Sequence, residues 1–218
     1  MEGVWGNREV PSAGAGAPVA EPLAPTEPGA PAAPPPADPV VERPETEPEP
    51  ADQHASGQLR VPDGYTVIEG RPSGERRTVG VVVSRFNGEV TNRLLERALA
   101  TLDEAGVARE SILVMPVPGA FELPIAAMAL AKTRRYACVV ALGCVIRGET
   151  SHYDLVSGEA ASGLQLAAIE TGVPIAFGVL TTETRDQAEA RIDRAADAVH
   201  TALEMADLFG RLRAAARA

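Results

Sequence analysis

The sequence predicts an α/β fold in which one parallel sheet carries helices on both faces. From residue 78 onward, segments with the pattern of a buried strand and segments with the pattern of an amphipathic helix alternate four times. The strand segments are nearly continuous runs of valine, isoleucine, leucine and alanine, which is typical of parallel strands covered on both faces. Repeated β-α units of this kind predict a doubly wound sheet.

The first two β-α units can be delimited from their apolar patterns. Residues 78–84 (TVGVVVS) form the first predicted strand, and residues 90–105 show leucine and alanine at helical spacing. Residues 111–117 (SILVMPV) form the second predicted strand. The next helix is expected over residues 125–133, opened by Pro124 at an early position where proline is tolerated.

The last two units follow the same logic. Residues 136–142 (YACVVAL) predict a third strand and residues 155–170 a helix, and residues 175–180 (IAFGVL) predict a fourth strand. Residues 185–212 are predicted to be helical, with a possible break near Asp193. A threonine hydroxyl just before this last segment could cap its first turn.

A short β-like run at residues 65–69 (YTVIE) precedes the first unit and has no crossover helix of its own. It could add an edge strand to the sheet of its own subunit or to the sheet of a neighbour. Pairing with a neighbour would hide a sheet edge that is otherwise open to unwanted pairing.

Residues 1–60 differ in composition from residues 61–218, which we expect to form the folded domain. The first segment holds 13 of the 19 prolines, with ten acidic and three basic residues, so it carries −7 of the total formal charge of −10. It has too few large apolar residues to offset chain entropy, so a disordered tail with polyproline-II character is expected. The tail could be a solubilising spacer, or it could hold a docking segment at residues 1–10 around Trp5.

Charge and cysteine content exclude several classes of protein. A net charge of −10 argues against a nucleic-acid surface and against binding to an anionic membrane. No apolar run reaches the ~18 residues of a membrane span, and the N-terminus lacks a signal-peptide pattern, so a cytoplasmic location is expected. Cys138 and Cys144 cannot form a disulfide framework or a metal cluster, and we expect buried structural thiols.

Chemically useful residues gather where the predicted strands end, which is where open α/β sheets bind ligands. The stretch 143–154 (GCVIRGETSHYD) follows the third strand and precedes a helix. Its glycines, its backbone N–H groups and the Thr150 hydroxyl could hold an anion beside the helix start. His152 can exchange a proton near neutral pH. A lone histidine is more often structural, but the loop position and the neighbouring Asp154 strengthen the case for a catalytic role.

The other strand exits offer an aromatic ring and polar groups, each with a simpler alternative. Phe86 could stack on a flat heterocycle or fold back onto the core. Asn87 could bind a ligand or serve as a turn residue before a glycine. Glu122 could accept hydrogen bonds from a polyol or an amine, or it could interact with a helix dipole. Arg191, amid acidic residues, could be a solvated ion pair.

Seven motifs carry a resemblance to a known family. They are VIEG (67–70), VVVSRFN (81–87), VPGAFELP (117–124), LGCVIRGETSHYD (142–154), PIAFGVLTTET (174–184), QAEAR (187–191) and TALEMADL (201–208). Together they resemble the lumazine synthases, which make 6,7-dimethyl-8-ribityllumazine in riboflavin biosynthesis. The resemblance covers residues 65–208 and leaves the proline-rich tail outside.

The resemblance implies a three-layer flavodoxin-like sheet flanked by helices. It also implies a homo-oligomer, either a pentamer or a hollow shell of 60 subunits, with the active site between subunits. The strand at residues 65–69 would join the sheet of the adjacent subunit. Neither a metal nor an organic cofactor is implied.

The resemblance also implies a reaction and a set of roles. The reaction condenses 5-amino-6-(D-ribitylamino)uracil with 3,4-dihydroxy-2-butanone 4-phosphate and releases phosphate, with His152 moving protons. The pyrimidine ring would stack on Phe86, and Phe177 and Arg191 would come from a neighbouring subunit. The other implied substrate-binding residues are Asn87, Ala120, Phe121, Glu122, Val145 and Ile146. The implied phosphate-binding residues are Gly148, Glu149, Thr150 and Arg191.

One segment departs from the family pattern. After the arginine that matches Arg191, the family usually has a glycine-rich segment ending in Asn-Lys-Gly, whereas this chain continues as RIDRAA (191–196) into a predicted helix. The phosphate-binding lysine is therefore absent, and Arg194 could replace it because guanidinium binds phosphate well. A continuous helix here would change how pentamers meet. The alternative function is a non-catalytic homologue that binds lumazine or flavin, or that forms a compartment with a functional tail.

Overall fold

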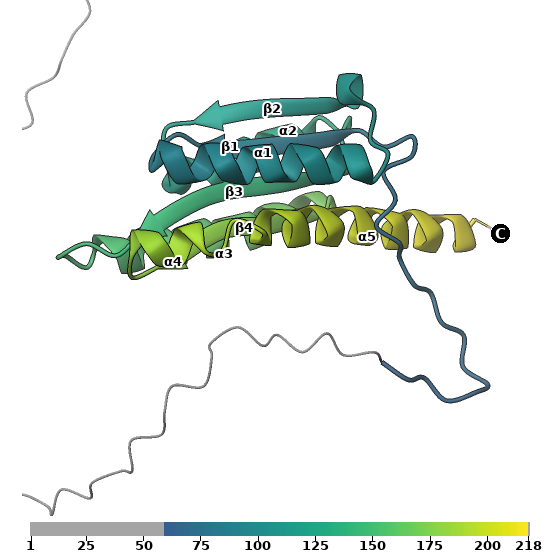
Figure 1. Cartoon of the computed structure of the whole chain (residues 1–218). Coiled ribbons are helices and arrows are strands. Elements are labelled where there is room, and N and C mark those ends of the chain that lie inside the picture. The colour runs from purple at the N-terminus through teal and green to yellow at the C-terminus, as the bar shows by residue number, and fades with distance from the viewer. Residues whose placement is uncertain (1–58, 218) are drawn as a thin grey trace, which may run out of the picture. The chain divides into compact units, whose positions relative to one another are not determined.

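In the computed structural model, which describes residues 59–217, four parallel strands form one sheet in the order β2-β1-β3-β4 (Figure 1). The strands are β1 (Val79–Ser84), β2 (Ile112–Val117), β3 (Cys138–Ile146) and β4 (Ile175–Thr182). Every residue of β1 is buried, as its nearly continuous apolar run predicts. The predictions for residues 1–58, including the tail and Trp5, lie outside the described residues.

Two helices cover each face of the sheet. The helices are α1 (Gly88–Glu104), α2 (Leu123–Lys132), α3 (His152–Thr171) and α5 (Arg194–Ala215). Alternate residues of β1 point to opposite faces: Val81 packs in one core with Leu94 of α1 and Leu203 of α5. Val82 packs in the other core with Leu123 of α2 and Leu164 of α3. The predicted three-layer α/β fold, with a parallel sheet between helices, is therefore confirmed.

The predicted break in the last helical region is also confirmed. A short helix, α4 (Arg185–Glu189), ends before α5 begins at Arg194, so the segment does not form one continuous helix. Thr184 begins α4 with a capping box, because the Gln187 N–H donates to its Oγ1 at 3.2 Å while the Gln187 side chain accepts from backbone N–H groups. Two 3₁₀ turns, η1 (Arg109–Ser111) and η2 (Ala120–Glu122), complete the connections.

Two predicted boundaries around the third strand are wrong. β3 continues to Ile146 instead of ending at Leu142, because its last four residues pair in parallel with residues 179–182 of β4. Gly143 fits this crowded position, since a Cβ on it would lie 3.1 Å from a Leu123 methyl carbon. The following helix, α3, begins at His152 rather than at residue 155.

The prediction that residues 65–69 could add an edge strand to their own sheet is wrong. These residues have no strand structure in the described chain, and Tyr65 and Val67 are exposed. The segment that follows them contacts α5 instead, because the Arg71 N–H donates a hydrogen bond to Asp207 Oδ2 at 3.1 Å. Pairing with a neighbour's sheet stays a prediction. None of the helices in residues 59–217 combines the length and the apolar character that a membrane crossing would require.

Candidate functional site

A cleft of about 690 Å³ opens at the carboxyl end of the sheet. This volume lies within the range of small-molecule sites. The walls come from the exits of β1 and β2, from the end of β3 and from the first turns of α3. The lining residues are Phe86, Asn87, Gly119, Ala120, Phe121, Glu122, Cys144, Val145, Ile146, Gly148, Thr150, His152, Tyr153, Leu155 and Val156.

Ten of the fourteen predicted site residues line this cleft, so residues drawn from three separate strand exits do converge. These ten are Phe86, Asn87, Ala120, Phe121, Glu122, Val145, Ile146, Gly148, Thr150 and His152. The other four, Glu149, Phe177, Arg191 and Arg194, are not among the lining residues.

Two aromatic rings stand in the cleft with most of their surface exposed. Phe86 follows β1 and is 69% exposed, and Phe121 lies in η2 and is 58% exposed. The alternative in which Phe86 folds back onto the core is therefore wrong. Exposed rings in a concave site can hold a planar ligand by stacking.

Asn87 joins the cleft to the sheet through its backbone and its side chain. It has a left-handed conformation, with φ of 57° and ψ of 45°, at the start of α1. Asparagine accepts this conformation more readily than most residues. Its Nδ2 donates to the backbone oxygen of Cys144 at 2.9 Å. The turn interpretation is therefore confirmed, and the same residue also lines the cleft.

Glu122 ends η2 and precedes the first residue of α2. Its side chain makes no capping hydrogen bond, and it lines the cleft. A Cβ on Gly119 would lie 3.1 Å from Glu122 Oε2, so the glycine leaves room for the carboxylate. The position agrees with both interpretations, since the carboxylate lies at a helix N-terminus and also faces a ligand-sized space.

Gly148 and Thr150 lie in the loop between β3 and α3. A Cβ on Gly148 would have no atom within 4 Å, so this part of the loop is open. The backbone N–H of His152 donates to Thr150 Oγ1 at 3.4 Å, and the 20-residue helix α3 begins directly after the loop. The N-terminus of a long helix favours an anion, so the loop has the features of a phosphate site.

His152 is the first residue of α3, and its side chain is exposed in the cleft. The expectation that Asp154 assists His152 is wrong. The Asp154 carboxylate pairs with the Arg147 guanidinium instead, at 3.1 and 3.2 Å. Side chains two positions apart on a helix do not face each other, which explains why the carboxylate does not serve the imidazole.

Arg147 connects three elements at the edge of the cleft. Besides Asp154 on α3, its guanidinium pairs with Glu183 after β4 at 2.8 Å and lies 4.0 Å from the ring centroid of Tyr153. Its backbone N–H donates to the Thr182 oxygen at 2.9 Å. Hydrogen bonds to Asp154 and then Glu183 raise the pKa of Arg147 above its ordinary value, so the guanidinium remains charged.

The two cysteines are free and buried, as predicted. Burial raises the pKa of Cys138 to about 12 and that of Cys144 to about 11, so both thiols are neutral at pH 7. Within residues 59–217, no three side chains of His, Cys, Asp or Glu come together in a way that could hold a metal ion.

The family model of 6,7-dimethyl-8-ribityllumazine synthase matches residues 76–210, a stretch that includes every residue of the cleft. This chain belongs to that family. The chain is also 48% identical over 149 residues to the 6,7-dimethyl-8-ribityllumazine synthase of Syntrophus aciditrophicus (strain SB). This match covers 66% of this chain and 97% of the relative. It is 48% identical over 149 residues to the enzyme of the same name from Gemmatimonas aurantiaca (strain DSM 14586 / JCM 11422 / NBRC 100505 / T-27), covering 66% of this chain and 91% of the relative.

Four of the predicted site residues lie outside the cleft of one chain. Glu149 is exposed in the loop before α3, and Phe177 is partly exposed on the edge strand β4. Arg191 lies in the turn between α4 and α5, where its Nη1 donates to the Gln187 oxygen at 2.9 Å. Arg194 begins α5 and pairs with Asp197 at 3.2 Å. In Figure 1, α4 lies at the end of the sheet where the β2 and β3 arrows point.

Five cleft residues were missed by the sequence reasoning: Gly119, Cys144, Tyr153, Leu155 and Val156. Gly119 and Tyr153 stand inside motifs shared with the lumazine synthases, so their position in the sequence was a usable signal. Leu155 and Val156 could be found only by starting α3 at His152, because they then lie within its first turns.

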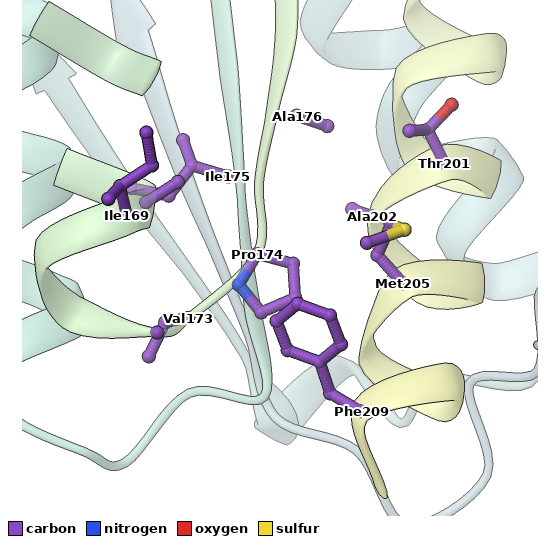
Figure 2. A pocket seen from close by; sticks show the side chains of 11 residues that line it. Ile169, Val173, Pro174, Ile175, Ala176, Thr201, Ala202, Met205 and Phe209 are labelled. Atoms are coloured by element: carbon purple, nitrogen blue, oxygen red, sulfur yellow. The ribbon is translucent and has the colours of Figure 1, made fainter. Parts of the chain in front are cut away.

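A second pocket, of about 310 Å³, lies at the opposite end of β4. Figure 2 shows Met205 and Phe209 of α5 on one side of it, Ile169 and Val173 on the other, and Pro174 between them. Its lining is apolar apart from a threonine and includes no ionisable side chain. It therefore lacks the groups for acid–base chemistry that the first cleft contains.

Proposed function

We propose that the protein condenses 5-amino-6-(D-ribitylamino)uracil with 3,4-dihydroxy-2-butanone 4-phosphate, giving 6,7-dimethyl-8-ribityllumazine and phosphate. The observation that carries this proposal is the convergence, in one cleft, of exposed aromatic rings, a carboxylate and an imidazole beside a helix N-terminus. Membership of the lumazine synthase family supports the same reaction.

In this proposal the pyrimidine substrate occupies the part of the cleft that the aromatic rings line. Its ring stacks on Phe86, and the ribityl hydroxyls bond with Asn87 and Glu122. Phe121 contributes a second apolar surface. Backbone groups of Ala120 and of Val145 and Ile146 at the end of β3 are available to the polar edge of the ring.

The phosphate of the second substrate binds at the loop before α3. Gly148, Glu149 and Thr150 provide backbone N–H groups and a hydroxyl there, next to the positive end of the α3 dipole. Arg191 of a neighbouring copy adds a guanidinium, and Arg194 takes the place of the missing lysine.

His152 moves protons between the two substrates. The 5-amino group attacks the ketone and water leaves, phosphate is then eliminated, and the ribityl-bearing nitrogen closes the ring with loss of a second water. Each of these steps transfers protons, and a positioned acid–base group contributes about 10²- to 10⁴-fold. Much of the remaining acceleration comes from holding both reactants together.

The protein is proposed to work as a homo-oligomer, a pentamer or a shell of 60 subunits. The outer face of α3 supports an association between copies, because Leu155, Leu166 and Ile169 are 63%, 52% and 72% exposed there. Exposed apolar residues repeated along one helix face are typical of a protein contact. Association would also bring Phe177 and Arg191 to the cleft of a neighbour, which neither reaches within one chain.

The test mixes the purified full-length protein with both substrates and follows the lumazine absorbance and the release of phosphate. One phosphate per lumazine, formed well above the uncatalysed rate, is the expected result. A rate equal to the uncatalysed background would reject the enzyme. Tight binding of ribityllumazine or riboflavin in that case would favour the non-catalytic homologue, which the missing glycine-rich segment after Arg191 suggests.

A further inference from the structure

Ion pairs from α1 hold both ends of the turn that carries Arg191. The turn, residues 190–193, joins α4 to α5. Arg93 pairs with the carboxylate of Glu189, the last residue before the turn. Arg97 Nε donates to Oδ1 of Asp193, the last residue of the turn, at 2.9 Å.

The two arginines project from a rigid part of the molecule. They are four residues apart on α1 and so share one face of the helix. On the adjoining face of the helix, Val90, Leu94 and Ala98 are at most 2% exposed, which fixes the helix on the sheet. The arginine side chains therefore start from a backbone that does not move with the turn.

The Arg93–Glu189 pair belongs to a longer chain of alternating charges. Arg185 of α4 pairs with Glu189 at 3.2 Å and also with Glu89 on the first turn of α1. An isolated exposed ion pair contributes little, whereas a network of several charges restrains its members more strongly. This network connects α1 to α4, the helix that directly precedes the turn with Arg191.

The turn itself leaves Arg191 little freedom. The Arg191 N–H donates to the Ala188 oxygen at 3.0 Å, and the Arg194 N–H donates to the Arg191 oxygen at 3.0 Å. Ala188 and Ala195, on either side of the turn, are completely buried. A small displacement of the turn along α1 would therefore displace the Arg191 guanidinium with it.

We propose that Arg93 and Arg97 are positioning residues that set where Arg191 presents its guanidinium to the phosphate of the substrate in a neighbouring copy. This inference rests on the proposed function, in which Arg191 binds that phosphate. The missing glycine-rich segment explains why such residues would be needed. The connection between α4 and α5 is short and has no lysine, so the ion pairs from α1 hold the Arg191 guanidinium in position.

The experiment uses the full-length protein with Arg93→Ala, Arg97→Ala and the double variant. Each single change is expected to raise the KM for 3,4-dihydroxy-2-butanone 4-phosphate about threefold and the double change about tenfold, as loss of exposed charge pairs predicts. The KM for the pyrimidine should stay within about twofold. The inhibition constant of inorganic phosphate, as a competitive inhibitor, should rise in the single variants and rise further in the double variant.

Arg109→Ala is the matched control. Arg109, the first residue of η1, is an exposed arginine that pairs with Asp103 of α1 at 2.6 Å, away from the turn. Its loss should change neither KM. Replacing both arginines by lysine, in Arg93→Lys with Arg97→Lys, keeps the positive charges opposite Glu189 and Asp193 and should preserve most of the wild-type KM for the phosphate substrate.

Arg191→Ala separates the two levels of the proposal. If Arg191→Ala raises the KM for the phosphate substrate and the α1 variants do not, the positioning role is rejected and the proposed function stands. If Arg191→Ala leaves that KM unchanged, Arg191 has no phosphate role and the inference fails with it. Equal rises in both KM values, or smaller assemblies by light scattering in the double variant, would also reject the positioning role.

Discussion

Arg147 and Asp154 form a bidentate ion pair at the edge of the cleft, with Nη2–Oδ1 and Nη1–Oδ2 distances of 3.1 and 3.2 Å. Two parallel hydrogen bonds of this kind fix the relative orientation of their partners as well as their distance. Arg147, at the start of the loop between β3 and α3, therefore connects the loop to α3 through Asp154. It also connects the loop to the end of β4 through Glu183. That loop contains Gly148 and Thr150 and leads directly to His152.

Arg147→Ala should therefore impair catalysis more than folding. The expected result is a fall in kcat of about tenfold, because small displacements of reacting groups are costly. The melting temperature should change little, since these ion pairs are exposed. Steady-state kinetics with both substrates and thermal unfolding by circular dichroism would measure the two effects. An unchanged kcat would mean that the ion pairs do not shape the site.

His152→Ala should slow turnover by about 10²- to 10⁴-fold without abolishing it, because acid–base help is only one part of the acceleration. The KM values should change much less than kcat, since the imidazole acts on the reacting atoms. Single-turnover absorbance measurements at saturating substrates would give the rate. A loss to the uncatalysed background would mean that His152 does more than move protons, and full activity would remove it from the mechanism.

The alternation of strands and helices could be predicted from the sequence, whereas the exact ends of the elements around the cleft could not. β1 could be predicted because its residues are buried on both faces and therefore form a nearly continuous apolar run, which is visible in the local sequence. Residues 143–146 read as a loop because they contain glycine and precede polar residues. They form strand only through pairing with residues 179–182 of β4, which are distant in sequence.

The same distinction applies to the site. Ten predicted residues share one cleft because motifs at successive strand exits are brought together by the parallel sheet. Asp154 is close to His152 in sequence but does not serve it, because its carboxylate pairs with Arg147. Phe177 and Arg191 lie outside this cleft in one chain, and their approach to the cleft of a neighbouring copy stays a prediction.

Asn87 allows its backbone role to be separated from its side-chain role. Asn87→Ala removes the bond to the Cys144 oxygen and places alanine at a φ of 57°, which costs about 1 kcal/mol more than glycine at such a position. Asn87→Gly removes the same bond without the strain. Urea unfolding should therefore rank wild type above Asn87→Gly and Asn87→Gly above Asn87→Ala. Alanine as stable as glycine would contradict the left-handed conformation.

The thiol of Cys144 provides a probe of cleft occupancy. Burial raises its pKa to about 11, and only the thiolate reacts with iodoacetamide, so alkylation of the native protein should be slow at pH 8 and roughly 100-fold faster at pH 10. Because Cys144 lines the cleft, 6,7-dimethyl-8-ribityllumazine should slow its alkylation.

Cys138 is the internal control for this experiment. It is buried at the start of β3, outside the cleft, and burial raises its pKa to about 12, so its alkylation should be slower still and should not respond to the lumazine. Peptide mass spectrometry after timed labelling distinguishes the two cysteines. Equal protection of both thiols would indicate that the ligand stabilises the whole domain rather than covering Cys144. An absence of protection at either would place the ligand outside the cleft.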